Sequence, residues 1–82
     1  MLKGIIRGNI VSTRKQDALV GSKFMEVQLE ENGKLTEKYI IAIDSVGAGI
    51  GERVLITTGS SARLALANTQ APTDAVIVGI VD

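Results

Sequence analysis

Five short runs rich in Val, Ile and Thr recur along this chain of 82 residues, and they set narrow limits on its fold. Such runs are typical of β-strands, because β-branched side chains pack well on a pleated surface. Five strands in one small domain favour a barrel, since closing the sheet removes the exposed edges that an open sheet would carry. We therefore expect an all-β fold, a five-stranded OB-like barrel, in a single domain that spans residues 1–82. The expected strands are residues 5–13, 23–29, 35–43, 53–58 and 75–81.

One short α-helix is expected over residues 60–68, before the last strand. Its Ala and Leu residues are good helix formers, and Ser60 or Ser61 can cap its first turn. A helix of about two turns is not stable alone in water, so it must pack on the barrel. The side chains expected to make this contact are spaced three and four residues apart: Ala62, Ala65 and Leu66.

Two hairpins compete for the connection between the second and third strands. A two-residue Asn-Gly turn places Leu29 opposite Thr36. A three-residue loop with Gly33 in the left-handed conformation places Leu29 opposite Leu35 instead. The three-residue loop keeps apolar side chains together, so the sequence favours it. The other pairs it implies are Met25 with Tyr39 and Glu30 with Lys34.

The last expected strand, residues 75–81, is apolar on both faces instead of alternating. One face can line the core of the barrel, and the other face needs a second cover. Two covers are open at this point: the chain's own helix and loops, or a neighbouring subunit. In a domain of this size a single core only just offsets chain entropy, which favours help from association.

Composition excludes most catalytic and metal-binding classes. The chain contains no cysteine and no histidine, which removes the thiolate nucleophile, the commonest metal ligand and the commonest general base. Nine basic and nine acidic side chains cancel and are spread along the chain, so no nucleic-acid partner is expected. The N-terminus has no apolar run of signal-peptide length, and no run is long enough to span a membrane. We expect a cytoplasmic protein that is not an enzyme, uses no metal or cofactor and has no membrane partner.

Two short motifs resemble functional sites that the rest of the chain does not support. The glycines from Gly47 to Gly51 resemble a dinucleotide-binding loop, but Glu52 takes the place of its last glycine and a strand follows instead of a helix. Ser60 or Ser61 resembles a nucleophile, but no histidine exists to activate it. We interpret the first motif as a tight connection and the second as a helix cap.

Three blocks of sequence, taken in order, resemble the EutN/CcmL family, the pentameric vertex proteins of bacterial microcompartment shells. The central block is residues 44–63, which read Asp-Ser-Val-Gly-Ala-Gly-Ile-Gly-Glu-Arg-Val-Leu-Ile-Thr-Thr-Gly-Ser-Ser-Ala-Arg. The downstream block joins residues 72–75 to residues 79–82. The upstream block fits a Thr-x-Lys…Leu-x-Gly-x-Lys pattern at Thr13, Lys15, Leu19, Gly21 and Lys23. The resemblance covers nearly the whole chain.

This resemblance implies a structural function. It implies a homopentamer that caps the vertices of a carboxysome or a catabolic microcompartment, beside hexameric shell proteins. The alternative with the same strand count is an OB-fold binding module for nucleic acid or another small ligand. That module lacks stacking platforms, because the only aromatic residues, Phe24 and Tyr39, are both expected on core strands.

The resemblance also implies which residues lie at the subunit interface or around the pore of the ring. Asp44 and Arg63 carry charge, and we expect a carboxylate–guanidinium contact between them, either within one subunit or between two subunits. We expect Arg14, Lys15 and Lys23 to form a small basic patch around the loop at residues 13–21, and the resemblance makes this loop a candidate for contact with adjoining shell tiles. The expected interface or pore residues are Asp44, Gly47, Gly49, Gly59, Ser60, Ser61 and Arg63.

Overall fold

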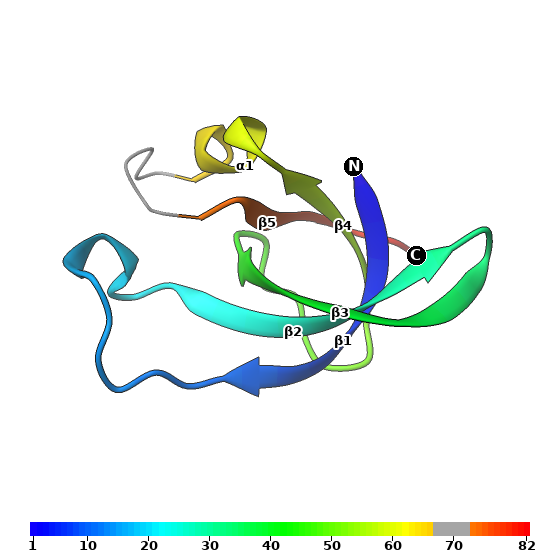
Figure 1. The fold of residues 1–82 in the computed structure, drawn as a ribbon, viewed down its shortest axis with the longest axis horizontal. Coiled ribbons are helices and arrows are strands. Elements are labelled where there is room, and N and C mark those ends of the chain that lie inside the picture. Colours follow the sequence, from blue (N-terminus) through cyan, green and yellow to red (C-terminus); the bar gives the residue numbers. More distant parts are fainter. Residues whose placement is uncertain (67–72) are drawn as a thin grey trace.

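The computed structural model describes residues 1–66 and 73–82 of the chain. The elements are β1 (Leu2–Ile10), a 3₁₀ turn (Asp17–Leu19), β2 (Lys23–Glu31), β3 (Lys34–Asp44), β4 (Arg53–Thr58), α1 (Ser60–Leu64) and β5 (Ala75–Ile80). The strands form a closed barrel in the order β1-β2-β3-β5-β4 (Figure 1). The expected five-stranded barrel with one short helix before its last strand is therefore confirmed. Within the described residues, no helix is long and apolar enough to cross a membrane.

β1 lies earlier in the chain than the sequence indicated, at Leu2–Ile10 instead of residues 5–13. Its first residues are held on both sides, since Lys3 faces Glu30 of β2 and Leu55 of β4. Its ladder with β2 ends at Ile10, close to the residue at which β2 begins. The residues after Ile10 have strand propensity, but that propensity alone does not supply a partner strand. The other four strands lie within two residues of their expected bounds, and β4 matches them.

The β2–β3 hairpin closes through a two-residue turn, so the three-residue loop favoured by the sequence is wrong. Asn32 and Gly33 have φ angles of 53° and 77°, and a two-residue turn of this kind needs positive values at both central positions. Glu31 pairs with Lys34 on either side of the turn. Asn visits the left-handed region more readily than other residues with a side chain, which makes the shorter turn accessible.

A bulge beyond the turn then changes the register of the hairpin. The irregularity lies at residues 28–30 of β2, where Thr36 Oγ1 donates a 2.8 Å hydrogen bond to the carbonyl oxygen of Leu29. Leu29 is 8 % exposed and Leu35 is 45 % exposed, so the expected apolar pair does not form. Tyr39, expected on a core strand, is 51 % exposed, and it does not pair with Met25. The observed pairs are Gln28 with Tyr39 and Met25 with Ala42.

The interior of the barrel is filled by apolar side chains from all five strands and from the loop after β3. Fully burying a Val, Ile, Leu or Met side chain contributes about 1.5–3 kcal/mol, so this cluster is the main stabilising feature of the chain. The members are Ile6, Met25, Val27, Leu29, Ala42, Ala48, Val54, Ile56, Ala75 and Ile77.

A second apolar cluster covers the outer face of β5. Val76 is fully buried there between Ile43 of β3 and Ala62 of α1. Of the two covers considered for the last strand, the chain's own helix and loops therefore cover the part of β5 near Val76. The half-buried side chains that pack against the cluster are Leu19, Phe24, Leu66 and Val78.

α1 is shorter than expected. The helix covers Ser60–Leu64, and residues 67 and 68 of the expected helix lie outside the described residues. Ala62 is fully buried and Leu66 packs on the outer cluster, as expected. The expected contact of Ala65 is wrong: this residue is the C-cap of α1, and it is exposed.

Candidate functional site

Asp44 fixes the turn that follows β3. Its Oδ1 atom accepts hydrogen bonds from the backbone N–H groups of Val46 (3.0 Å) and Gly47 (3.2 Å). Its Oδ2 atom accepts a third hydrogen bond from the N–H of Ala48 (3.0 Å). Gly47 has a φ of 81°, a conformation that residues with a Cβ rarely adopt. The carboxylate therefore acts first on its own loop, which brings Ala48 into the barrel core.

The glycine loop after this turn lies against β1. The N–H of Gly51 donates to the carbonyl oxygen of Ile6 (2.8 Å), and the N–H of Ile6 donates to the carbonyl oxygen of Glu52 (3.0 Å). Glu52 also accepts a 2.6 Å hydrogen bond at Oε1 from the N–H of Gly49. The tight connection expected from the glycines is confirmed. Glu52 was not among the expected site residues, although its position three residues after Gly49 is a signal for this type of local acceptor.

The N-cap of α1 is Gly59, and neither Ser60 nor Ser61 takes this position. It has φ 70° and ψ −151°, a region that is essentially restricted to glycine. Its N–H donates to the carbonyl oxygen of Asp74 (2.9 Å), and its carbonyl oxygen accepts from Ala62 (3.1 Å). The expected capping by Ser60 or Ser61 is wrong, because both lie inside the first helical turn and no side-chain capping hydrogen bond forms. Their hydroxyl groups are on exposed residues.

The structure brings two of the candidate segments to one strand. Asp44 pairs with Ile77 of β5, and Gly59 bonds to Asp74, three residues earlier in the chain. At the rise of an extended strand, these two attachment points lie roughly 10 Å apart. Gly49 lies apart from them, in the loop that bonds to β1.

The two charged candidates do not pair with each other inside one chain. The ion pairs among the described residues join Glu30 to Lys3 and Arg53, and Glu31 to Lys38. Arg63 lies on the last turn of α1 and is exposed, as is its neighbour Leu64 at 76 %. A contact of Arg63 with a carboxylate of another subunit stays a prediction.

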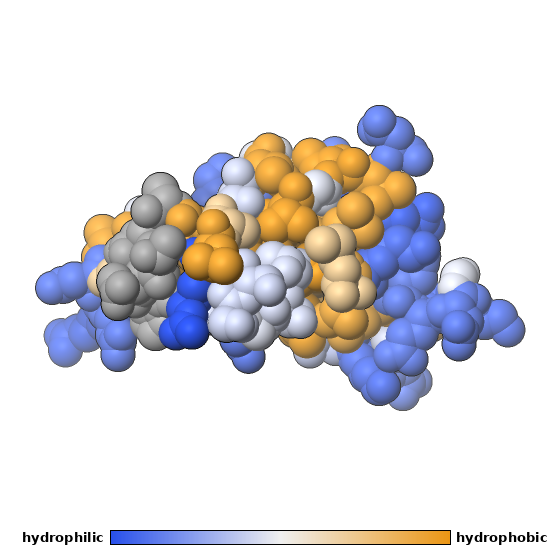
Figure 2. All heavy atoms as spheres, turned by 90° about the horizontal axis from the view of Figure 1, so that it is seen from above, coloured by the Kyte–Doolittle hydropathy of each residue, from blue (hydrophilic) through white to orange (hydrophobic). Residues whose placement is uncertain are grey.

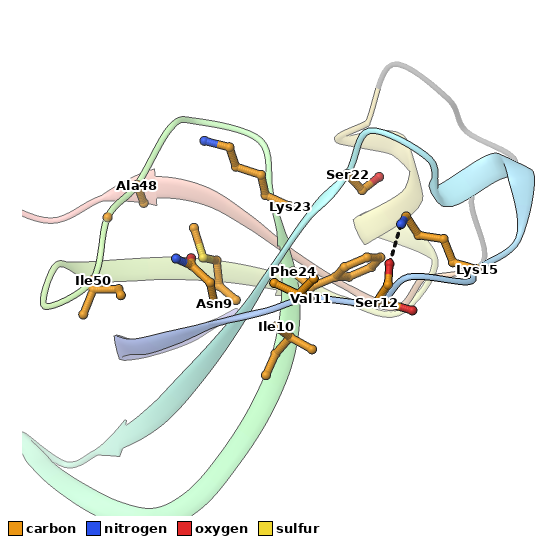
Figure 3. A pocket seen from close by; sticks show the side chains of 12 residues that line it. Asn9, Ile10, Val11, Ser12, Lys15, Ser22, Lys23, Phe24, Ala48 and Ile50 are labelled. Carbon is orange, nitrogen blue, oxygen red and sulfur yellow. Dashed lines mark hydrogen bonds between the residues drawn. The ribbon is translucent and has the colours of Figure 1, made fainter.

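An open groove with a volume of about 530 Å³ was not expected from the sequence. It lies between the end of β1, the start of β2 and the loop at Ile50 (Figure 3). The lysines at its rim were noted only as a basic patch, and its apolar side chains come from three separate segments that only the fold brings together. The main apolar side chains of the groove are Ile10, Val11, Phe24, Met25 and Ile50, and its lysines are Lys15 and Lys23.

The described residues hold no group of three or more His, Cys, Asp or Glu side chains that could bind a metal ion. The carboxylates of Asp44 and Glu52 accept backbone hydrogen bonds within their own loop. The candidate segments therefore fix the path of the backbone and the form of the surface around it. An arrangement of this kind suits contact between proteins.

Comparison with known proteins identifies the family. The sequence model described as "Ethanolamine utilisation protein EutN/carboxysome" matches residues 1–82. The carboxysome shell vertex protein CcmL of Nostoc sp. is 51 % identical over 79 residues, which cover 94 % of this chain and 78 % of that protein. The solved structure of Gloeobacter violaceus CcmL has a TM-score of 0.95 at 42 % identity, and the match covers 100 % of this chain and 86 % of that one.

A further solved structure carries information on assembly. It is the GrpN pentameric microcompartment shell protein from Rhodospirillum rubrum, with a TM-score of 0.89 at 38 % identity. The match covers 100 % of this chain and 94 % of that one. The matched sequence model, the identity to the relatives and the shared barrel show that the chain belongs to the EutN/CcmL family.

Proposed function

We infer that this chain is a structural vertex protein of a bacterial microcompartment shell, and that five copies form the ring that caps a vertex. The observation that carries this function is the match over the whole chain to a protein solved as a pentameric shell protein. The relatives in several organisms are named as shell vertex proteins, and the family is structural and not enzymatic. The chain therefore belongs in a microcompartment shell within the cytoplasm.

The surface of a single copy supports association. Large apolar side chains stay exposed on it, among them Val11 at 86 %, Ile50 at 62 % and Ile41 at 55 %. Figure 2 shows apolar side chains gathered on one face of the molecule. A small domain with exposed apolar patches gains stability when neighbouring copies cover them.

The loop and helix-start residues are proposed to lie at subunit contacts or around the opening of the ring. The turn at Asp44 and the turn at Gly59 are both anchored on β5, and the second carries exposed hydroxyl and guanidinium groups on α1. Such rigid backbone turns can position side chains for a neighbour without moving. The residues included are Asp44, Gly47, Gly49, Gly59, Ser60, Ser61 and Arg63.

Hexameric shell proteins are the proposed neighbours of the ring, because five-fold units occupy the corners of a closed shell whose faces are tiled by six-fold units. An OB-fold module for nucleic acid is not favoured. The formal net charge is zero, and the chain has only two aromatic residues, Phe24 and Tyr39, so it offers few surfaces on which bases could stack. The whole chain is proposed to act as one domain and to need no cofactor.

Native mass spectrometry of the purified protein tests the ring directly. Five copies per particle are expected at micromolar concentration. Co-expression with hexameric shell proteins should then give closed particles, and omission of this chain should leave open or elongated ones. A stable monomer would contradict the function, and a six-membered ring would contradict the vertex position.

A further inference from the structure

The tip of the β2–β3 hairpin carries a pair of residues whose chemistry the proposed vertex function does not use. Asn32 and Gly33 form the two-residue turn between Glu31 and Lys34, and all four residues are exposed. In Figure 1 this hairpin projects beyond the rest of the barrel, on the side away from the 3₁₀ turn. Water and hydroxide therefore reach the backbone of the turn.

An asparagine is chemically labile where the backbone nitrogen of the next residue can reach its side chain. The Gly33 nitrogen, once it has lost its proton, attacks Cγ of Asn32 and closes a five-membered imide. The bond from Cγ to Nδ2 breaks, and the side-chain nitrogen leaves as ammonia with the proton that Gly33 gave up. Water then opens the imide at either carbonyl carbon, which yields an aspartate or an isoaspartate.

Three features of the turn favour this attack. Gly33 has no side chain to crowd its nitrogen, and a Cβ built there meets no atom within 4 Å. The turn hydrogen bonds among the described residues do not include the Gly33 N–H, so this nitrogen is not held by an acceptor. Residues 31–35 are all exposed, so no packed side chain opposes the local rotation that brings the nitrogen to Cγ.

Asn9 offers the same side chain in a setting that should prevent the reaction. It is exposed, as Asn32 is, but it lies within β1 and is followed by Ile10, whose branched Cβ crowds the attacking nitrogen. Asn9 and Ile10 are also held in the ladder with β2, opposite Met25 and Phe24. The two asparagines thus differ in backbone freedom and in the residue that follows, and not in access to water.

We propose that Asn32 is a site of spontaneous deamidation in the folded protein, at which Gly33 supplies the attacking nitrogen. The aspartate product keeps the hairpin, because Asp-Gly suits the same two-residue turn as Asn-Gly. The isoaspartate product carries the main chain through Cγ and adds one backbone atom to the turn, which loosens the pairing of Glu31 with Lys34. Either product places a new carboxylate next to Glu31.

Ageing of the purified protein in mildly alkaline buffer, followed by peptide mapping, tests the proposal. The peptide that contains Asn32 should gain the mass difference between a hydroxyl and an amino group and should separate into two products. The peptide that contains Asn9 should stay unchanged over the same period. The loss of Asn32 should speed up as pH rises, because hydroxide removes the proton from the Gly33 nitrogen. Asn32→Asp supplies the reference for the aspartate product and so identifies the other product as isoaspartate.

Asn32→Gly is the matched variant, because it removes the reacting amide and keeps a turn that Gly-Gly also supports. This variant should age without a change of mass at the hairpin, and its circular dichroism should match that of the wild type. Hydrogen exchange at the hairpin should become faster in the wild type as it ages and should stay constant in Asn32→Gly.

The chain unfolded in guanidinium chloride separates the effect of the fold from that of the sequence. Loss of Asn32 in the unfolded chain, with Asn32 intact in the folded protein over the same period, would show that the turn protects the residue and would overturn the proposal. Equal loss of Asn9 and Asn32 in the folded protein would also overturn it, since the open turn and Gly33 would then have no effect. Loss confined to Asn32 in the folded protein, with both products present, supports it.

Discussion

The Oδ2 atom of Asp44 accepts a 3.0 Å hydrogen bond from the backbone N–H of Ala48, a residue that is only 5 % exposed. The other carboxylate oxygen accepts from Val46 and Gly47. One side chain thereby links the end of β3 to the point at which the next loop enters the core. This loop lies beside the residues that close the barrel, where Asp44 pairs with Ile77.

Asp44→Ala should lower the free energy of unfolding by about 2–3 kcal/mol, because three backbone amides lose a charged acceptor. Asp44→Asn should lower it by roughly half as much, since one side-chain oxygen remains as an acceptor. Urea unfolding at a fixed chain concentration measures the change, because association adds a concentration-dependent term.

Glu37→Ala is the control for this measurement, because Glu37 is exposed and its side chain forms no ion pair with the described residues. A change below about 0.5 kcal/mol is expected for it. Equal stability of Asp44→Ala and Glu37→Ala would show that the loop does not depend on the carboxylate.

The barrel could be predicted from the sequence because its signals are local. β-branched runs, separated by Gly-, Asn- and Ser-rich turns, indicate strands wherever they occur, and five short strands leave few closed arrangements. The register of β2 and β3 could not be predicted in the same way. It depends on the bulge at residues 28–30, where Thr36 bonds to Leu29, and this contact exists only after the strands have paired.

The role of Asp44 shows a similar limit at the candidate site. The sequence marked the residue as a charge within a recognised block, and a pair with Arg63 was the expected use of that charge. The structure instead satisfies the carboxylate with backbone amides of its own loop. Local acceptors of this type compete with distant partners because they need no ordering of a second long side chain. The groove was missed for the opposite reason, because its walls are distant in sequence.

Gly59→Ala should destabilise the chain through backbone strain alone. Gly59 has φ 70° and ψ −151°, and a Cβ built there meets no atom within 4 Å, so the cost is conformational and not steric. About 1–3 kcal/mol is expected. Gly8→Ala is the matched control, since its Cβ also meets nothing within 4 Å and its φ is not in the positive region. Thermal unfolding of both variants side by side measures the difference, and similar midpoints would contradict the strain.

Gly4→Ala should fail for a different reason. A Cβ at this position would lie 2.5 Å from the carbonyl oxygen of Gln28 and 2.6 Å from Val27 Cγ1, which is closer than real Cβ atoms approach. β1 and β2 must then separate locally, at about 1–3 kcal/mol or more. Hydrogen exchange should show faster opening of the β1–β2 ladder in this variant than in Gly8→Ala. Unchanged protection of Val27 would show that the strands adapt without loss.

Glu30→Gln tests the ion pairs that cross β1. The Glu30 side chain is 5 % exposed and lies 3.4 Å from Lys3 Nζ and 3.3 Å from an Arg53 nitrogen. The two cations are about half exposed, so solvent screens the pairs and the expected loss is about 1 kcal/mol. The loss should shrink as salt concentration rises. The control is Glu31→Gln, whose pair with Lys38 is exposed on both sides, and it should change stability by less than about 0.5 kcal/mol.

Arg63→Ala should separate the stability of the ring from the stability of the subunit. Arg63 is exposed on α1 and forms no ion pair with the described residues of its own chain. Its removal should therefore change the free energy of unfolding of the subunit by less than about 0.5 kcal/mol. If a neighbouring carboxylate or carbonyl group buries it at a subunit contact, the ring should weaken by roughly 2–4 kcal/mol. Arg63→Lys should weaken the ring by an intermediate amount, because an ammonium group keeps the charge and loses the planar fork.

Sedimentation at several concentrations measures ring dissociation for Arg63→Ala. Arg14→Ala is the comparison, because Arg14 is an exposed cation in the loop after β1. A dissociation constant for Arg63→Ala equal to that of Arg14→Ala would show that Arg63 is an ordinary surface charge.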